Sequence, residues 1–176
     1  MQSHLKQPGS SVTGGTFSVR CVTRHRQAAL QSDRAAALLV AVVYDLRELG
    51  TFQVHEFVVM PEHFHLLITV RPGTTIESAV QMIKQEFVSR AENELGLLSP
   101  VWQEGFSEAR LDGLHSFSEA RQYIQSNPVA RGLVVDAGQY PFSSANGSFE
   151  LDPLPLKLRT APDRGPLRRV MNADIA

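Results

Sequence analysis

The sequence predicts an α+β domain built on a four-stranded antiparallel sheet with two helices on one face. Four short segments are rich in β-branched and aromatic residues or alternate between apolar and polar side chains, as strands do. Amphipathic helical segments separate them in the order strand, helix, strand, strand, helix, strand. This order is that of the split βαβ, or ferredoxin-like, arrangement. A further C-terminal helix follows the fourth strand, and the second face of the sheet is expected to be free for a site.

The first half of the chain supplies a strand, a helix and a hairpin. Residues 16–23, "TFSVRCVT", alternate as a strand does. A helix is expected between the N-cap Ser32 and the C-terminal Gly50. Its apolar stripe consists of Leu38, Val42, Leu46 and Leu49. Residues 51–60, "TFQVHEFVVM", indicate a second strand, and residues 64–70, "FHLLITV", return after a tight connection as its hairpin partner.

A long second helix follows the hairpin. Thr74 and Glu77 have the spacing of a capping box, and Gly96 stands where a helix-terminating glycine is expected. The apolar stripe between them predicts that this helix covers the same face of the sheet as the first. The stripe consists of Ile76, Val80, Ile83, Phe87, Ala91 and Leu95.

The last elements are a fourth strand and a short helix. Residues 101–111, "VWQEGFSEARL", indicate the strand. Ser116 and Glu119 have the spacing of another capping box and open the helix. The helix is expected to end near Ser126, because the residue before Pro128 is biased away from helical backbone angles.

Length and composition indicate one globular domain. The chain has 176 residues, of which 43% are hydrophobic and 20% charged. The domain is expected to span residues 16–147. Residues 1–15 are expected to form a flexible lead without the apolar stretch of a signal peptide. Residues 148–176 are expected to form a loose tail, because apolar residues become few there while Pro, Arg and Asp increase.

Charge, cysteine content and hydropathy restrict the class of protein. The net charge of −1 does not by itself indicate a nucleic-acid binder, so a polyanionic partner would have to meet a local basic surface. A single cysteine, Cys21, permits no intrachain disulfide, which fits a cytoplasmic location. The longest apolar run, residues 35–43, is too short to cross a membrane.

Two histidines lie at alternate positions of the third predicted strand. Side chains alternate between the faces of a sheet, so His63 and His65 share the face opposite the apolar set Phe64, Leu66 and Ile68. Two neutral imidazoles a few ångströms apart can bind one divalent metal together with a further ligand. The same alternation points Glu62 away from the histidines. A purely structural or exposed histidine pair is the alternative interpretation.

The last predicted helix carries a phenol and a carboxamide one turn apart. Tyr123 and Asn127 are four residues apart and therefore share a helical face, which is offset from the apolar stripe. Tyrosine is a weak nucleophile unless it or its target is activated, and a bound metal can polarise a phosphoryl group. Attack by the tyrosine on a DNA phosphodiester would retain the bond energy and permit rejoining. The alternative is a half-buried tyrosine followed by a helix-ending Asn-Pro.

Four blocks of the sequence resemble one family. "VVMPEHFHLLI" resembles the His-hydrophobe-His motif of HUH single-strand nucleases, in particular the REP-associated tyrosine transposases of the IS200-like group. "WQEGFSEARL", "YIQSNPVARGLV" and "YPFSSA" resemble later blocks of that family in the same order. The likeness covers residues 16–147. Glu62 departs from the family pattern, in which asparagine is expected.

The resemblance implies a metal-dependent endonuclease and strand transferase that acts on single-stranded DNA through a 5′-phosphotyrosine. Carried over, His63, His65 and Asn127 would be the ligands of Mg²⁺ or Mn²⁺, and Tyr123 would be the nucleophile. The implied substrate is a hairpin-forming DNA repeat. Family members include monomers and homodimers, so the resemblance leaves the oligomeric state open.

Basic side chains on several elements are candidate contacts for DNA phosphates. Those near the first strand and in "ARL" are favoured because they flank the proposed site. The full set is Arg20, Arg24, Arg26, Lys84, Arg90, Arg110, Arg121 and Arg131. Trp102 and Phe106 are candidates for stacking on a base, with burial in the core as the alternative for Trp102.

Two other functions are compatible with the same residues. A ferredoxin-like sheet can bind single-stranded nucleic acid without any reaction, although the aromatic-rich strand of RNA-recognition domains is missing here. A hydrolytic metalloenzyme, in which the metal activates water and Tyr123 is structural, would release product without a covalent adduct.

Overall fold

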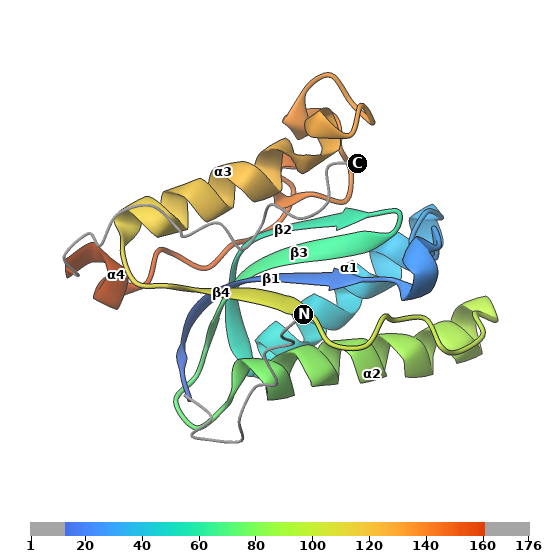
Figure 1. The fold of residues 1–176 in the computed structure, drawn as a ribbon, viewed down its shortest axis with the longest axis horizontal. Helices are drawn as coiled ribbons and strands as arrows, with labels where there is room; N and C mark the ends of the chain where they lie inside the picture. Colours follow the sequence, from blue (N-terminus) through green and yellow to red (C-terminus); the bar gives the residue numbers. More distant parts are fainter. Residues whose placement is uncertain (1–12, 161–176) are drawn as a thin grey trace, which may run out of the picture.

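A computed structural model describes residues 13–160 and contains the predicted elements in the predicted order (Figure 1). Three short 3₁₀ turns, η1 to η3, and a five-residue α4 complete the fold. The bounds are β1 Gly15–Val22, η1 Arg24–Arg26, α1 Asp33–Glu48, β2 Phe52–Met60, β3 His63–Val70, α2 Ile76–Leu95, β4 Ser107–Leu111, α3 Leu114–Ala130, η2 Ala137–Gln139, η3 Ser144–Asn146 and α4 Leu156–Thr160.

The four strands form one antiparallel sheet in the order β2-β3-β1-β4. With α1 and α2 as the two crossovers, this is the ferredoxin-like topology, and the predicted fold class is confirmed. β3 lies in the interior of the sheet, between β2 and β1. His63 is registered with Met60 and Val22, and His65 with Val58 and Arg20. The backbone of both histidines is therefore held by hydrogen-bonded strands on each side.

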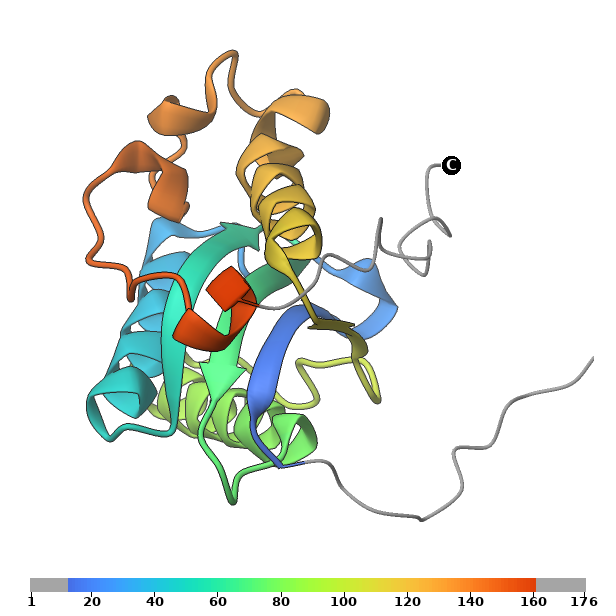
Figure 2. The ribbon, with the colours of Figure 1, turned by 90° about the vertical axis from the view of Figure 1, so that its left-hand side faces the viewer.

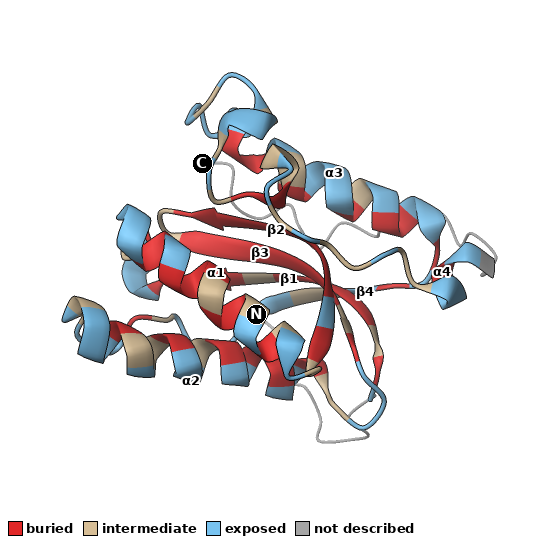
Figure 3. Cartoon of the chain, turned by 180° about the vertical axis from the view of Figure 1, so that it is seen from behind, coloured by how far each residue is buried: buried red, intermediate tan, exposed pale blue. Residues whose placement is uncertain are grey.

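The sheet has a core on each face. Helices α1 and α2 cover one face, and α3 crosses the other (Figures 1 and 2). β2 and β3 are almost entirely buried and β1 is mostly buried, whereas the edge strand β4 and the outward sides of the helices are largely accessible (Figure 3). The larger core, on the α1/α2 side, contains Phe57, Phe64, Leu66, Ile83 and Phe87 among others. The smaller core consists of Val58, Met60, Leu67, Leu111, Phe117, Ala120, Ile124 and Leu158.

Local capping explains the start of α1 and both ends of α2, whereas α3 begins at Leu114 after Gly113 without a side-chain cap, so the capping box predicted at Ser116 was wrong. The Ser32 side chain accepts a hydrogen bond from the backbone N–H of Ala35, as an N-cap should. The cap of α2 is Thr75, which accepts from the N–H of Ser78, so the predicted capping box at Thr74 was one residue early. Gly96 ends α2 with a φ of 65°, a left-handed conformation that favours glycine.

The helix α3 continues past the position at which the sequence predicted its end. It includes Pro128 and ends at Ala130. The bias of the residue before a proline is a preference of limited size, and here the packing of Ile124, Asn127 and Pro128 against the sheet overrides it. As a consequence, Asn127 is fixed on the helix one turn after Tyr123.

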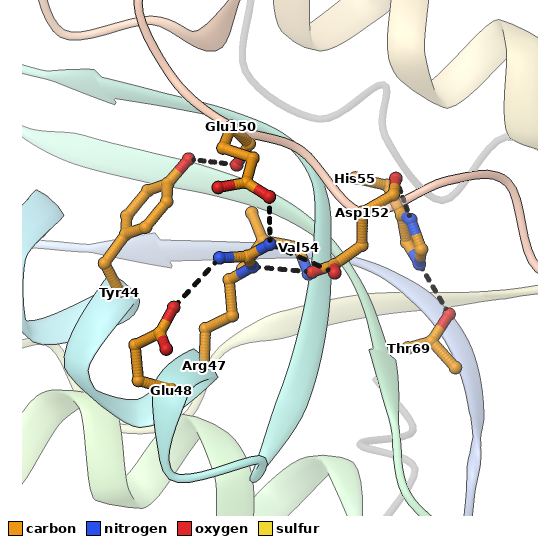
Figure 4. Close-up of polar contacts among 8 residues, drawn as sticks. All are labelled: Tyr44, Arg47, Glu48, Val54, His55, Thr69, Glu150 and Asp152. Carbon is orange, nitrogen blue, oxygen red and sulfur yellow. Dashed lines mark hydrogen bonds and ion pairs between the residues drawn. The ribbon is translucent and has the colours of Figure 1, made fainter.

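The segment after residue 148 is attached to the domain, so the prediction of a loose tail was wrong for residues 148–160. The backbone N–H of Asp152 donates to the carbonyl of Val54 at 2.7 Å. Its carboxylate accepts from Arg47 Nε and from the N–H of Val54, each at 2.8 Å (Figure 4). Leu158 is buried in the smaller core. A few well-placed polar and apolar contacts therefore order a segment whose composition indicates disorder.

The terminal parts of two predicted regions lie outside the described residues. These are residues 1–12 of the expected lead and residues 161–176 of the expected tail. Within the described part of the chain, no helix has both the length and the apolar character needed to cross a membrane.

Candidate active site

The two histidines of β3 lie on the face that α3 covers. His63 and His65 are 2% and 1% exposed, and their ring centroids are 5.0 Å apart. Phe64, between them along the strand, points to the other face and contacts Trp102 at a ring-centroid distance of 5.4 Å. The alternation predicted from the sequence is therefore present, and it presents two imidazoles side by side beneath a helix.

α3 brings Tyr123 and Asn127 to the histidines. The Tyr123 ring meets the His65 ring edge-to-face with centroids 5.3 Å apart, and its side chain remains 39% exposed. Asn127 Nδ2 lies 3.5 Å from His65 Nε2, at the limit of a hydrogen bond. Phe117, Ala120 and Ile124 bury the adjacent stripe of the helix. The structure thus places a phenol, a carboxamide and two imidazoles in one location.

Several buried polar atoms around this location lack a hydrogen-bond partner among the described residues. They are His65 Nδ1, Asn127 Oδ1, Arg20 Nε and Ser18 Oγ. Buried polar groups are almost always satisfied, so a cluster of such atoms indicates a place for a ligand. Arg20 and Ser18 lie on β1 with their side chains on the same face as the histidines.

The residues present fit a divalent cation. The oxygen and nitrogen of an asparagine amide are assigned from their surroundings, and a half-turn of the Asn127 amide would bring Oδ1 beside His65 Nε2. Two lone pairs facing each other repel unless a cation lies between them. The described residues contain no group of three or more His, Cys, Asp or Glu side chains able to hold a metal. A site here would therefore use two imidazole nitrogens and an amide oxygen, a donor set suited to Mn²⁺ or Mg²⁺.

Burial keeps both imidazoles neutral at neutral pH. It lowers the pKa of His63 to about 4, with Glu62 acting in the opposite direction. Burial also holds the pKa of His65 well below its usual value, and the neighbouring His63 and Arg20 add to this effect. Neutral imidazole is the form that binds a metal, because its free nitrogen carries a lone pair.

Glu62 lies against the site, contrary to the prediction that it points away. Its Oε1 is 3.1 Å from His63 Nδ1 and 3.2 Å from Arg131 Nη2. The prediction was wrong because Glu62 belongs to the turn between β2 and β3 rather than to a strand, and alternation does not hold in a turn. The sequence signal that could have indicated this was the tightness of the "PEH" connection.

A second carboxylate, missed by the sequence reasoning, anchors α3 to the sheet. Glu56 on β2 is fully buried on the histidine face. Its Oε2 accepts from Arg121 Nε at 2.9 Å and from Gln125 Nε2 at 2.8 Å, and its Oε1 accepts from Ser144 Oγ. Arg121 and Gln125 are one helical turn apart on α3. This carboxylate therefore fixes the rotation of the helix that carries Tyr123.

Three of the eight predicted phosphate contacts, Arg20, Arg121 and Arg131, lie on the side of the sheet that carries the histidines. Arg20 lies beside His65 in the sheet register. Arg24 and Arg26 are exposed in η1, directly after β1. Arg121 lies on α3 and Arg131 is its C-cap residue, and each forms an ion pair with a carboxylate of the sheet or its turn.

The remaining three basic residues are not brought to the site. Lys84 donates to two backbone carbonyls of the loop before β4, and Arg90 pairs with carboxylates on α1 and α2. Arg110 is registered with Phe17 on the α1/α2 face, with its guanidinium over that ring. The expectation that Arg110 flanks the histidines was wrong, because the register of β4 places the neighbouring residues of that strand on the site face.

The aromatic residues considered for base stacking also belong to the other face. The predicted fourth strand begins at Ser107 rather than at residue 101, and Trp102 precedes it. The Trp102 ring contacts Phe64 and Phe87, and its Nε1 donates to a backbone carbonyl of α2. Phe106 packs against the same core. Packing of Trp102 in the core, the alternative left open by the sequence, is closer to what the structure shows: the partly buried ring packs against the α1/α2 core.

Comparison with known proteins decides the family. A family model described as "Transposase IS200 like" matches residues 11–127, more than half of the chain. The chain belongs to the IS200-like transposase family. It is therefore an enzyme of the HUH-type DNA endonucleases, as the histidine motif predicted.

Relatives of this IS200-like transposase support the assignment. It is 27% identical over 147 residues to the REP-associated tyrosine transposase of Escherichia coli K12, covering 80% of this chain and 86% of the relative. A solved REP-associated tyrosine transposase bound to a REP hairpin is 25% identical, with a TM-score of 0.62 over 90% of this chain and 97% of that chain. A protein from Deinococcus radiodurans R1, described as a proposed transposase, shares the fold at 20% identity and a TM-score of 0.51, covering 69% of this chain and 97% of the other.

Proposed function

We propose that this transposase cleaves and rejoins single-stranded DNA at hairpin-forming repeats, with Tyr123 as the nucleophile. The observation that carries the proposal is the contact of the Tyr123 ring with His65, at 5.3 Å between centroids, beside a second buried histidine and Asn127. The phenol is also partly exposed, so a DNA strand can reach it. The E. coli relative is a REP-associated tyrosine transposase, and the solved relative is bound to a REP hairpin, which supports a hairpin substrate.

The chemistry follows from a phenol as nucleophile. The Tyr123 oxygen attacks the phosphorus, a new P–O bond forms to the tyrosine, and the bond to the 3′-oxygen of the preceding nucleotide breaks. The phenol proton passes to solvent, and the leaving oxygen takes up a proton to become a free 3′-hydroxyl. The product is a 5′-phosphotyrosine, which a second 3′-hydroxyl can attack to join strands with no external energy source.

His63, His65 and Asn127 are the proposed metal ligands. Neutral imidazoles and an amide oxygen leave the positive charge of Mg²⁺ or Mn²⁺ largely uncompensated, and such an ion polarises the phosphoryl group when bound. The unpartnered Asn127 Oδ1 supports this assignment.

Arg20 is the proposed contact to the reacting phosphate. It is adjacent to His65 on the neighbouring strand, and its Nε is buried without a partner among the described residues. A guanidinium binds phosphate oxygens through parallel N–H donors, which orients the phosphate as well as attracting it. Arg24 and Arg26, exposed on η1, are proposed contacts to the DNA backbone farther from the reaction.

The test is formation of a covalent protein–DNA adduct. Incubation with Mn²⁺ and single-stranded hairpin DNA labelled on the 3′ side of the cleavage point should give an adduct on a denaturing gel. Tyr123→Phe should give none, and a chelator should abolish adduct formation by the wild type. The matched control is Tyr44→Phe, because the Tyr44 hydroxyl only donates to the carbonyl of Glu150, away from the histidines.

Two results would refute parts of the proposal. An adduct that persists in Tyr123→Phe would exclude this residue as the nucleophile. A cleaved product with no adduct at any time point would favour the hydrolytic alternative, in which the metal activates water.

A further inference from the structure

The carboxylate of Glu62 is held between an imidazole and a guanidinium. Its Oε1 is 3.1 Å from His63 Nδ1 and 3.2 Å from Arg131 Nη2. The Glu62 side chain is largely buried, and His63 almost completely. Arg131 is the C-cap residue of α3, and its backbone N–H donates to the carbonyl of Asn127. One oxygen atom thus joins the histidine strand to the end of the tyrosine helix.

The contact determines where the His63 proton must be. An ionised carboxylate only accepts hydrogen bonds, so the contact requires a proton on Nδ1. In a neutral imidazole with its proton on Nδ1, the lone pair lies on Nε2. His65 differs, since its Nδ1 has no partner among the described residues. Of the two imidazoles, His63 alone has a carboxylate that selects its tautomer.

We propose that Glu62 is a positioning residue that fixes His63 as the Nδ1–H tautomer and thereby leaves its Nε2 lone pair available for the metal. A carboxylate on the far nitrogen of a metal-binding histidine orients the ring and strengthens it as a ligand. Arg131 contacts the same carboxylate oxygen and so helps to keep Glu62 in contact with the ring. The metal-binding part of this inference rests on the proposed function, whereas the tautomer does not.

Two substitutions separate the hydrogen bond from the charge. Glu62→Gln retains a side-chain oxygen that can accept from His63 Nδ1, but it removes the negative charge that faces Arg131. Glu62→Ala removes both. The matched control is Glu104→Ala, which removes an exposed glutamate from the loop before β4. Because Glu62 lies in a turn, we expect all three variants to fold, and circular dichroism checks this.

The first measurement is the nitrogen NMR spectrum of the histidine imidazoles in the metal-free, DNA-free protein at neutral pH. The wild type, Glu62→Gln and Glu104→Ala should show a protonated Nδ1 and an unprotonated Nε2 for His63. Glu62→Ala should lose this pattern and move toward a mixture of tautomers. A wild-type His63 protonated on Nε2, or a Glu62→Ala spectrum identical to wild type, would overturn the inference.

The second measurement is the affinity for Mn²⁺ alone, by calorimetry or by electron paramagnetic resonance. Loss of such an outer partner typically weakens metal binding about 10- to 100-fold, so we expect at least about a tenfold loss in Glu62→Ala. Glu62→Gln should lose less, and Glu104→Ala nothing. Equal affinities for the wild type and Glu62→Ala would overturn the metal part of the inference. If the protein bound no Mn²⁺ at all, the proposed metal site would fail while the tautomer result would stand.

Discussion

The ion pair between Arg121 and Glu56 joins α3 to β2 through a carboxylate with no solvent exposure. Arg121 Nε lies 2.9 Å from Glu56 Oε2, and the arginine side chain is 51% exposed whereas the glutamate is fully buried. Replacing Arg121 with Met keeps most of its aliphatic stem but removes the guanidinium. The buried carboxylate would then be left with the neutral donors Gln125 and Ser144.

The expected cost lies between those of a buried and an exposed pair. Removing one partner of a fully buried ion pair costs about 3–5 kcal/mol, because an uncompensated charge remains. Exposed pairs contribute about 1 kcal/mol or less. Since only the carboxylate of this pair is buried, we expect Arg121→Met to lower the free energy of unfolding by about 2 kcal/mol. In a thermal melt this corresponds to about 4–8 °C for a domain of this size.

The chain offers a matched control on the opposite face. Arg90 Nε lies 2.9 Å from Glu94 Oε1, the same distance, but the carboxylates that Arg90 contacts are 49% and 66% exposed. Arg90→Met should therefore cost less than about 1 kcal/mol, since water solvates the carboxylates that it leaves. Urea denaturation followed by far-ultraviolet circular dichroism compares the two variants. Equal losses would refute the reasoning that burial of the carboxylate sets the cost.

Two further predictions concern pH and the C-terminal segment. Burial lowers the pKa of His55, His63 and His65, so at mildly acidic pH the unfolded chain binds protons that the folded chain does not. The free energy of unfolding of the metal-free protein should therefore fall as the pH drops from about 7 to about 5, by up to about 1.4 kcal/mol per pH unit for each histidine. Urea titrations that gave the same free energy of unfolding at each pH would contradict this. Asp152→Ala removes the carboxylate that connects the C-terminal segment to α1 and β2. Trypsin should therefore cut within residues 153–160 faster than in the wild type. Unchanged cleavage kinetics would contradict the inference that this carboxylate holds the segment.

Features set by local periodicity were predictable from the sequence. The alternation of residues along β3 placed the histidines on one face, and the apolar stripes of α1 and α2 placed both helices on the other. Tyr123 and Asn127 share a helical face because they are four residues apart. That argument needed the helix to continue through Pro128, which local preference opposes and which packing on the sheet decides.

Features that depend on distant partners were not predictable. Glu56 and Arg121 are 65 positions apart, and nothing near either residue indicates the other. The direction of the Glu62 side chain was mispredicted because the alternation of strand residues does not apply to a turn. The residues around Asp152 were misjudged because composition measures the average burial that a segment can achieve, whereas a few specific hydrogen bonds can hold it.

The position of Trp102 makes the two faces of the sheet distinguishable by spectroscopy. It is the single tryptophan of the chain, and it lies between Phe64 and Phe87 in the α1/α2 core. The smaller core beneath α3 contains none. Indole emission therefore reports one side of the sheet, while ellipticity reports helices on both sides. A denaturation in which ellipticity declines before the emission changes would reveal α3 lifting from the histidines while the rest of the domain stays folded. The native protein therefore carries an optical label that separates opening of its site from global unfolding.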